Sequence, residues 1–389
     1  MESRINETIE EVIGVSPEIV DKALDKTIDK LYREVLDIIE AIDRIRSTIL
    51  LKGSFTIKQM DRSMDLCYYA LDSSFTSPAI ELIGGYLGIV VVSYTSFGKT
   101  CGRTEVDSKV LVDLNFVEDL TNIYAKYYER QTALKLLNAK KVGEINFDVL
   151  LLDGELIPRI LPSWRLQNSK KSRLYQRIID MTEEMMELAD KTDTAIVGVL
   201  KRSYSRDIVN ILGYKELKMS DRAVLSLVLK PGEYVILGSY VDLRNELLKL
   251  KDKGSVDNEW LRARIPWYDG IIRSMAGHTV RLAFYRAENT VYPTATKIEY
   301  LTSSTLDEDT LISSIMKIST GTGIPTPIDY VDALLNIPAS LKYTVYQKII
   351  AELYKKLGAN FDKASVFLSL MNPEKMRFLK DSSKLAPPN

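Results

Sequence analysis

The clearest pattern of apolar and polar positions lies between residues 15 and 50. Apolar residues recur there in alternating steps of four and three, with charged residues between them: Leu24, Ile28, Leu31, Val35, Ile38, Ile42, Ile45 and Ile49. This spacing predicts a long helix with an apolar seam. Ser16 suits its N-cap and Pro17 its first turn. The seam fits a helix packed on its own domain, and it equally fits a dimer seam or a docking arm for a partner.

Beyond Gly53 the pattern changes to short apolar runs that are typical of strands. In chain order we predict strands at 67–71, 86–96 and 103–114, a helix at 116–141, a strand at 149–152, a helix at 172–190 and a strand at 195–201. Three successive strands favour antiparallel pairing, and the strand–helix alternation after them favours parallel crossovers. The order resembles that of ribonuclease H-like proteins. We therefore expect an α/β fold: a ribonuclease H-like mixed sheet with flanking helices, an N-terminal helical arm and C-terminal helices.

The second half of the chain is less regular. It predicts strands at 232–240 and 278–286 and helices at 328–338 and 341–358. The last residues, 379–389, have the composition of a disordered tail.

Composition narrows the chemistry that the chain can perform. Its 389 residues carry a net charge of −1, so no global basic field points to nucleic acid, although a local basic groove stays possible. Two cysteines, Cys67 and Cys101, do not make a disulfide framework. With the single His278 they cannot complete a Cys/His zinc site, and one histidine disfavours a Ser-His-Asp triad. A metal here is held by carboxylates, which select hard ions such as magnesium or manganese.

No apolar run approaches the ~20 residues that a membrane span needs, and the first residues are too charged for a signal peptide. We therefore expect a cytoplasmic protein without a membrane partner. No glycine loop of the G-x-x-x-x-G-K-[ST] kind occurs, so the chain carries no such ATPase motif of its own.

Two aspartates follow apolar strand candidates. Asp72 comes after 67–71 and Asp153 after 149–152, and each precedes a small residue. Either one alone is ordinary turn chemistry. Together, in this strand order, they fit carboxylates presented at one sheet edge to hold two divalent ions, which activate water and stabilise a leaving oxygen in phosphodiester hydrolysis. Turn formers in an unrelated α/β protein remain the alternative.

Several segments, in this order along the chain, resemble motifs of the NurA nucleases, the DNA-end-processing enzymes that work with the HerA translocase. They are ALDSSFTSPAIELIGGYLGIVVVSY from residue 70, FDVLLLDGELI from 147, AIVGVLKRSYSR from 195, SDRAVLSLVLKPGEYV from 220 and GIPTPIDYVDALLNIP from 323. The resemblance implies a NurA-like nuclease domain at 67–378, between an N-terminal helical arm at 1–66 and a disordered tail at 379–389.

The resemblance also implies the activity. It points to a metal-dependent deoxyribonuclease, a 5′-3′ exonuclease and single-strand endonuclease that acts on single- and double-stranded DNA in double-strand-break end resection. The expected partners are a HerA-like hexameric ATPase and a second copy of the chain. The expected cofactor is a pair of Mn²⁺ or Mg²⁺ ions bound by Asp72 and Asp153, with Glu129 on the preceding helix as a further ligand. An exposed helix glutamate is the alternative for Glu129, and Glu105 and Asp113 on the third strand are competing ligands.

The C-terminal motif departs from the family where Asp332 takes the place of a histidine. Aspartate binds a hard divalent ion well, but it is no near-neutral proton shuttle unless its pKa is raised. Asp332 is thus a candidate catalytic residue and metal ligand. The alternative function is a catalytically weakened or inactive NurA-like module that binds DNA and the ATPase.

Basic and aromatic residues supply candidate DNA contacts. Lys201, Arg202 and Arg206 follow a strand closely and can contact phosphates, or can form a solvated basic loop. A second basic cluster, SKKSR, starts at residue 169 and is typical of plain surface. Among 21 tyrosines, four are candidates for stacking on unpaired bases, or else are packing residues: Tyr127, Tyr128, Tyr204 and Tyr285.

Overall fold

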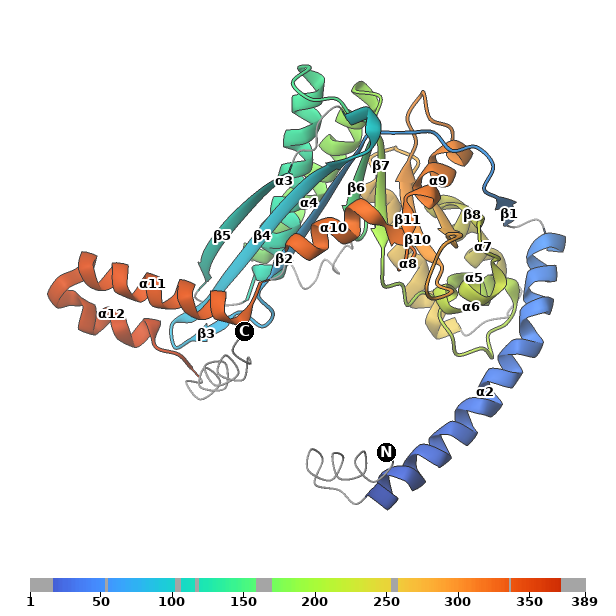
Figure 1. Ribbon diagram of the computed structural model, residues 1–389, viewed down its shortest axis with the longest axis horizontal. Coiled ribbons are helices and arrows are strands. Elements are labelled where there is room, and N and C mark those ends of the chain that lie inside the picture. Colours follow the sequence, from blue (N-terminus) through green and yellow to red (C-terminus); the bar gives the residue numbers. More distant parts are fainter. Residues whose placement is uncertain are drawn as a thin grey trace.

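A ten-stranded mixed sheet forms the centre of the molecule (Figure 1). The computed structural model describes residues 17–52, 55–101, 106–115, 119–158, 170–252, 258–335 and 337–371. The strands of this sheet are β1 (Thr56–Gln59), β2 (Tyr68–Phe75), β3 (Ile80–Leu82), β4 (Gly85–Phe97), β5 (Val106–Asn115), β6 (Val149–Asp153), β7 (Ala195–Leu200), β8 (Glu233–Ser239), β9 (Arg281–Tyr285) and β10 (Thr296–Leu301). A separate small ribbon pairs β11 (Ser319–Thr320) with β12 (Ile324–Pro325). The predicted tail at 379–389 and Glu105 lie outside the described residues.

Five strands reproduce the predicted ribonuclease H-like order. β2 pairs antiparallel with β4, and β4 pairs antiparallel with β5. β2 also pairs parallel with β6, which pairs parallel with β7. The spatial order β5-β4-β2-β6-β7 therefore combines an antiparallel meander with two parallel crossovers, and the predicted fold class is confirmed.

Four of the remaining strands extend this sheet beyond β7: β10, β9, β8 and β1 follow one another, each antiparallel to its neighbour. The fifth, β3, pairs antiparallel with β4 at the other end of the sheet. We did not predict β1, β3 or β10 from the sequence. β10 is completely buried, with no exposed positions to mark a strand face, so it lacks the alternation that reveals a half-exposed strand.

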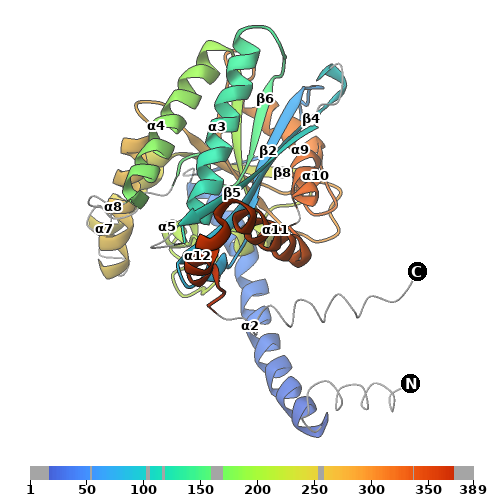
Figure 2. The same cartoon turned by 90° about the vertical axis from the view of Figure 1, so that its left-hand side faces the viewer.

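Helices cover both faces of the sheet (Figure 2). They are α2 (Pro17–Lys52), α3 (Thr121–Lys141), α4 (Lys170–Lys191), α5 (Asp207–Leu212), α6 (Asp221–Val228), α7 (Tyr240–Asp252), α8 (Asn258–Ser274), α9 (Glu308–Lys317), α10 (Thr326–Leu334), α11 (Ala339–Leu357) and α12 (Phe361–Leu368), with single 3-10 turns at η1 (Lys99–Cys101) and η3 (Gly358–Asn360). α3 to α8 pack on one face, and α9 and α10 on the other. Along β2, Tyr69 and Leu71 join the first core while Tyr68 and Ala70 join the second, as the two-residue period of a strand requires.

The predicted long helix packs on the body only through its C-terminal part. Ile45 and Ile49 are buried, and Arg46 donates a bidentate pair of hydrogen bonds, both 2.7 Å long, to Glu233 at the start of β8. Toward the N-terminal end the same apolar seam is solvent-exposed at Leu24 and Ile28. Figure 1 shows α2 projecting away from the sheet. One seam therefore serves intramolecular packing at one end and is uncovered at the other.

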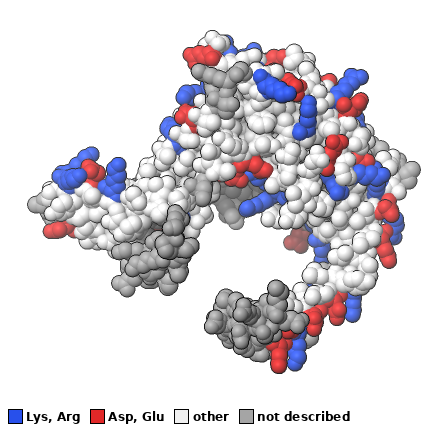
Figure 3. Space-filling view, viewed as in Figure 1, with Lys and Arg blue, Asp and Glu red and all other residues white. Residues whose placement is uncertain are grey.

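Charges of both signs are interspersed over the face seen in Figure 3, in keeping with the net charge of −1. None of the helices in the described part of the chain is long and apolar enough to cross a membrane. The two cysteines do form a bond: Cys67 and Cys101 are joined by a disulfide with their Cα atoms 4.8 Å apart. This bond ties the residue before β2 to η1.

Candidate metal centre

Asp72 and Asp153 meet where the parallel pairing of β2 with β6 ends, at the carboxyl end of β6. Parallel neighbouring strands present their carboxyl ends at the same edge. Alternation places Asp153 on the same face as the buried Val149 and Leu151, and Asp72 on the same face as Ala70. This is the face that α10 covers, so α10 adds Asp332 from a segment distant in the sequence.

Asp72 does not end its strand, contrary to the prediction. The parallel pairing with β6 stops at Leu71, but pairing with β4 continues through Asp72, which faces Ser93, to Phe75. Asp72 is therefore held by a strand backbone rather than by a turn. Asp153 does end β6, and Gly154 follows it with φ +107°, a conformation that glycine adopts without strain.

Three carboxylates converge at this edge. One oxygen each of Asp72, Asp153 and Asp332 lies within 4.8 Å of the other two. Asp72 is buried, Asp153 is half-buried and Asp332 is exposed, so the cluster opens toward solvent on the α10 side. Lys201, at the end of β7, places its Nζ 2.9 Å from Asp153 and 2.8 Å from Asp332. A side-chain ammonium thus lies among oxygens whose arrangement suits a cation.

The pKa of Asp72 indicates that the single ammonium of Lys201 does not balance the negative charge of this cluster. Burial, and then the neighbouring carboxylates of Asp153 and Glu129, raise the pKa of Asp72 to about 8. The Ser73 amide, 2.6 Å from Oδ1, and the charge of Lys201 act in the opposite direction but do not offset it. A divalent ion supplies the missing charge and favours the ionised carboxylate. The donor set, all carboxylate oxygen, fits a hard ion such as Mg²⁺ or Mn²⁺.

Glu129 reaches the cluster from the opposite face of the sheet. It lies on α3, and its side chain is fully buried, so the alternative of an exposed helix glutamate is wrong. The Ser73 hydroxyl donates to its Oε2 at 3.0 Å, and the Lys126 ammonium donates to the same oxygen at 3.2 Å. Because Ser73 follows Asp72 directly, this hydrogen bond places Glu129 beside the buried aspartate. Glu129 is not one of the three carboxylates whose oxygens lie within 4.8 Å of one another.

Arg130 is a supporting residue that sequence reasoning missed. Its guanidinium is completely buried, donates to Glu129 Oε1 at 3.2 Å and also donates to the carbonyls of Glu155 and Leu156 at 2.6 and 3.1 Å. It therefore fixes both Glu129 and the loop that follows Asp153. The adjacent Glu-Arg pair in a helix was the available signal, but helix surfaces commonly carry such pairs.

The other basic and acidic candidates lie in different surroundings. Arg206 donates to the backbone carbonyls of Lys215 and Leu217, and Arg202 is exposed. Of the three predicted DNA contacts, Lys201 is the one that touches the carboxylate cluster. The backbone of Asp113 pairs with Gly88 inside β5, and two strands, β4 and β2, separate β5 from β6. Tyr285 is fully buried and shares a hydrogen bond with Ser319, so it cannot stack on a base.

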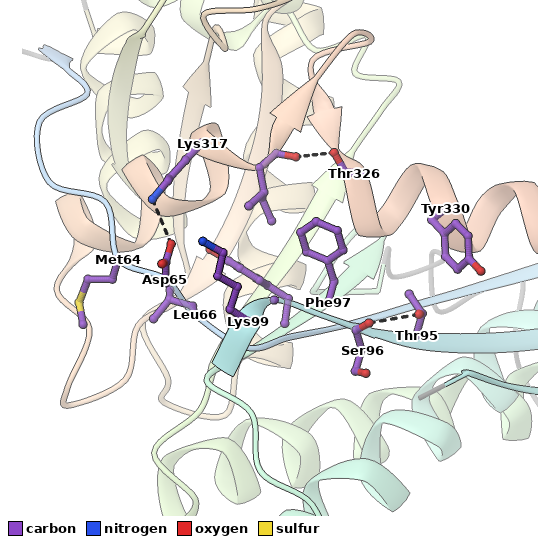
Figure 4. A pocket seen from close by; sticks show the side chains of 13 residues that line it. Met64, Asp65, Leu66, Thr95, Ser96, Phe97, Lys99, Lys317, Thr326 and Tyr330 are labelled. Atoms are coloured by element: carbon purple, nitrogen blue, oxygen red, sulfur yellow. Dashed lines mark hydrogen bonds and ion pairs between the residues drawn. The ribbon is translucent and has the colours of Figure 1, made fainter. Parts of the chain in front are cut away.

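Two hollows lie along α10. A cavity of about 580 Å³ lies at the N-terminal end of this helix, between Tyr68, Phe97 and Thr326 (Figure 4). Its lining includes the ion pair of Lys317 with Asp65, and none of the three clustered aspartates. A more open depression of about 710 Å³ includes Asp332 in its lining. Of these two hollows, the second therefore borders the carboxylate centre.

Fold and site together define an α/β protein of ribonuclease H-like strand order with a carboxylate centre at the sheet edge. The family model described as "NurA domain" matches residues 67–337, and the chain belongs to the NurA family.

Among solved structures, the NurA nuclease from Sulfolobus solfataricus is 13% identical, with a TM-score of 0.55, and the match covers 86% of this chain and 98% of that one. A structure titled as NurA with manganese is 14% identical, with a TM-score of 0.47 and coverage of 84% and 98%. No curated protein matches the chain.

Proposed function

We propose that this protein is a metal-dependent deoxyribonuclease. The observation that carries the proposal is the convergence of Asp72, Asp153 and Asp332, from three separate segments, with oxygens within 4.8 Å of one another. Membership of the NurA family, and a fold shared with a protein titled as a NurA nuclease, support hydrolysis of DNA as the reaction.

Asp72, Asp153 and Asp332 would hold the ions, with Glu129 next to them as a fourth carboxylate. When bound, a pair of Mg²⁺ or Mn²⁺ ions supplies an activated water and stabilises the leaving oxygen of the phosphodiester. The chain's own residues orient this centre: Ser73 and Arg130 hold Glu129, and Lys201 holds Asp153 and Asp332 together. We also propose that Lys201, Arg202 and Arg206, which follow β7, contact phosphates of the DNA backbone.

The finer features of the activity follow from family membership. We propose 5′-3′ exonuclease and single-strand endonuclease activity during double-strand-break end resection, on single- and double-stranded DNA. The assembly would be a homodimer docked on a HerA-type hexameric ATPase. We assign residues 1–66 to a helical arm, 67–378 to the nuclease domain and 379–389 to a tail. The exposed seam of α2 at Leu24, Ile28, Leu31 and Val35 supports a role of the arm in assembly.

A second candidate is a weakened or inactive binding module. The observation that favours it is the 2.8 Å ion pair between Asp332 and Lys201, which engages the group that stands in place of the family's histidine. Histidine shuttles protons near neutral pH at its usual pKa, whereas a carboxylate does so only where its pKa is raised.

Labelled single- and double-stranded DNA, incubated with the purified protein and manganese, separates these candidates. Cleavage that requires the metal and is abolished in Asp72→Asn supports the nuclease. The matched control is Asp180→Asn, which removes an exposed carboxylate from α4 and should leave cleavage unchanged. No cleavage with any divalent ion, combined with retained binding to a HerA-type ATPase, supports the module instead.

A further inference from the structure

A group of tyrosines and basic residues forms a second surface that the carboxylate centre does not use. α3 contributes Tyr124, Tyr127 and Tyr128, and α4 contributes Lys170, Arg173 and Arg177; we call these six residues the tyrosine–arginine surface. They line a depression of about 460 Å³ together with Leu174. No acidic residue is among its described lining. In a chain whose net charge is −1, such a local excess of cations needs its own explanation.

The three tyrosine rings contact one another. Tyr124 and Tyr128 lie one helical turn apart and stack at a centroid distance of 6.0 Å, and Tyr127 meets Tyr128 edge-on at 5.2 Å. Tyr128 packs against the main core of this sheet face. Tyr124 and Tyr127 pack on a small apolar core of Leu120, Ile123, Leu174 and Ile178. Two ammonium groups lie near the rings: Lys170 Nζ is 5.5 Å from the centroid of Tyr124, and Lys109 Nζ is 5.5 Å from that of Tyr128.

Aromatic faces beside cationic side chains match the chemistry of unpaired nucleotides. Bases stack on the rings regardless of sequence, while arginine and lysine neutralise the phosphates. Paired bases are already stacked inside a duplex, so the rings select single-stranded nucleic acid. An acidic peptide would use the cations but would gain little from the rings.

The surface lies close to the carboxylate centre, because the same helix serves both. Lys126 and Glu129 project from the opposite side of α3, where Lys126 Nζ donates to the carbonyl of Asp153 at 3.3 Å. Opposite faces of a helix are about 10–12 Å apart including side chains. The carboxylates lie on the other face of the sheet from α3, so a strand held on the tyrosines reaches them by passing α3 and the end of β6, where Lys126 contacts Asp153.

We infer that the tyrosine–arginine surface binds single-stranded DNA next to the cleavage centre. This inference rests on the proposed nuclease function and specifies single-stranded DNA as the substrate that is led to the carboxylate centre.

The test measures binding separately from cleavage. In the full-length Asp72→Asn protein, fluorescence anisotropy would follow a labelled oligothymidylate of about 16 nucleotides, which is within the range of known single-strand sites. Tyr127→Ala should weaken binding on the order of 5- to 100-fold, and Tyr127→Phe should restore it, because the ring face is kept. Replacing the two exposed arginines together, Arg173→Gln with Arg177→Gln, should weaken binding. The slope of the logarithm of the binding constant against the logarithm of the salt concentration should become shallower by about 0.7 for each phosphate that the protein no longer neutralises.

Two variants at other exposed positions serve as controls. Tyr292→Ala and Arg262→Gln should leave the affinity unchanged. Unchanged affinity in both Tyr127→Ala and the arginine pair would overturn the inference. So would an equal loss of duplex binding, competition by oligoglutamate as strong as by DNA, or a change of oligomeric state in place of a change in affinity. A cleavage assay on the protein with Asp72 intact shows which of the two proposals fails. If this protein cleaves DNA while the surface variants bind DNA normally, the binding surface alone is refuted. If it does not cleave DNA while the surface variants lose binding, the nuclease proposal alone is refuted.

Discussion

Replacing Asp72 by asparagine should stabilise the metal-free protein at alkaline pH while removing a metal ligand. The pKa of Asp72 is raised from an ordinary value of 3.8 to about 8. Between these values the folded state holds a proton that the unfolded state has released, so the stability that this group contributes is complete below about pH 4 and is lost as the pH rises toward 8. The loss is about 1.4 kcal/mol per pH unit, or about 4 kcal/mol between pH 5 and pH 8. The asparagine side chain does not titrate and so has no such dependence, and its amide oxygen can still accept from Ser73.

The assay is urea unfolding with a chelator present, at pH 5 and pH 8, for wild type and Asp72→Asn. The free energy of unfolding of the variant, minus that of wild type, should increase by up to about 4 kcal/mol across this range. Adding manganese should stabilise wild type at pH 8, by about 2.7 kcal/mol at a hundred times the dissociation constant, and should have much less effect on the variant. Asp180→Asn controls for the loss of one negative charge on the surface.

A difference between wild type and Asp72→Asn that does not change with pH would refute this reasoning. It would mean that the burial of Asp72 is already offset, for instance by Lys201, and that the cluster has no deficit of positive charge for a cation to fill. Equal stabilisation of both proteins by manganese would locate the metal elsewhere.

Three further changes test Arg130, the attachment of α2 and residue 332. Arg130→Met should cost about 3–5 kcal/mol in urea unfolding, because the buried Glu129 carboxylate loses one of its two cationic partners and the carbonyls of Glu155 and Leu156 lose a donor; an unchanged midpoint would contradict that role. Arg46→Met should weaken the attachment of α2 by about 1.5–3 kcal/mol, seen as faster trypsin cleavage within α2 alone; identical digestion patterns would show that its apolar contacts suffice. Asp332→His should raise the affinity for Mn²⁺ relative to Mg²⁺, since imidazole is a softer ligand than carboxylate; an unchanged ratio in calorimetry would place residue 332 outside the metal shell.

Several elements were predictable because their signal is local. β6 is a short apolar run that ends at Asp153 as predicted, and the predicted helix at 172–190 is observed as Lys170–Lys191. β2 was predicted too short, because a strand's end is set by its partner: β4 continues to pair with Asp72 and the three residues after it. β10 was missed because all its positions are buried by neighbouring elements, so no exposed face marks it as a strand.

The sequence by itself determined the order of β2, β4, β5, β6 and β7 and two of the acidic residues, since apolar runs and aspartates beside small residues are local features. Only the tertiary structure decided that Glu129 is buried beside Asp72, that Asp332 joins Asp72 and Asp153, and that Lys201 lies among them. These residues are brought together by chain segments far apart in sequence. Burial, proximity and the resulting charge balance are properties of that packing, so no local pattern of residues can encode them.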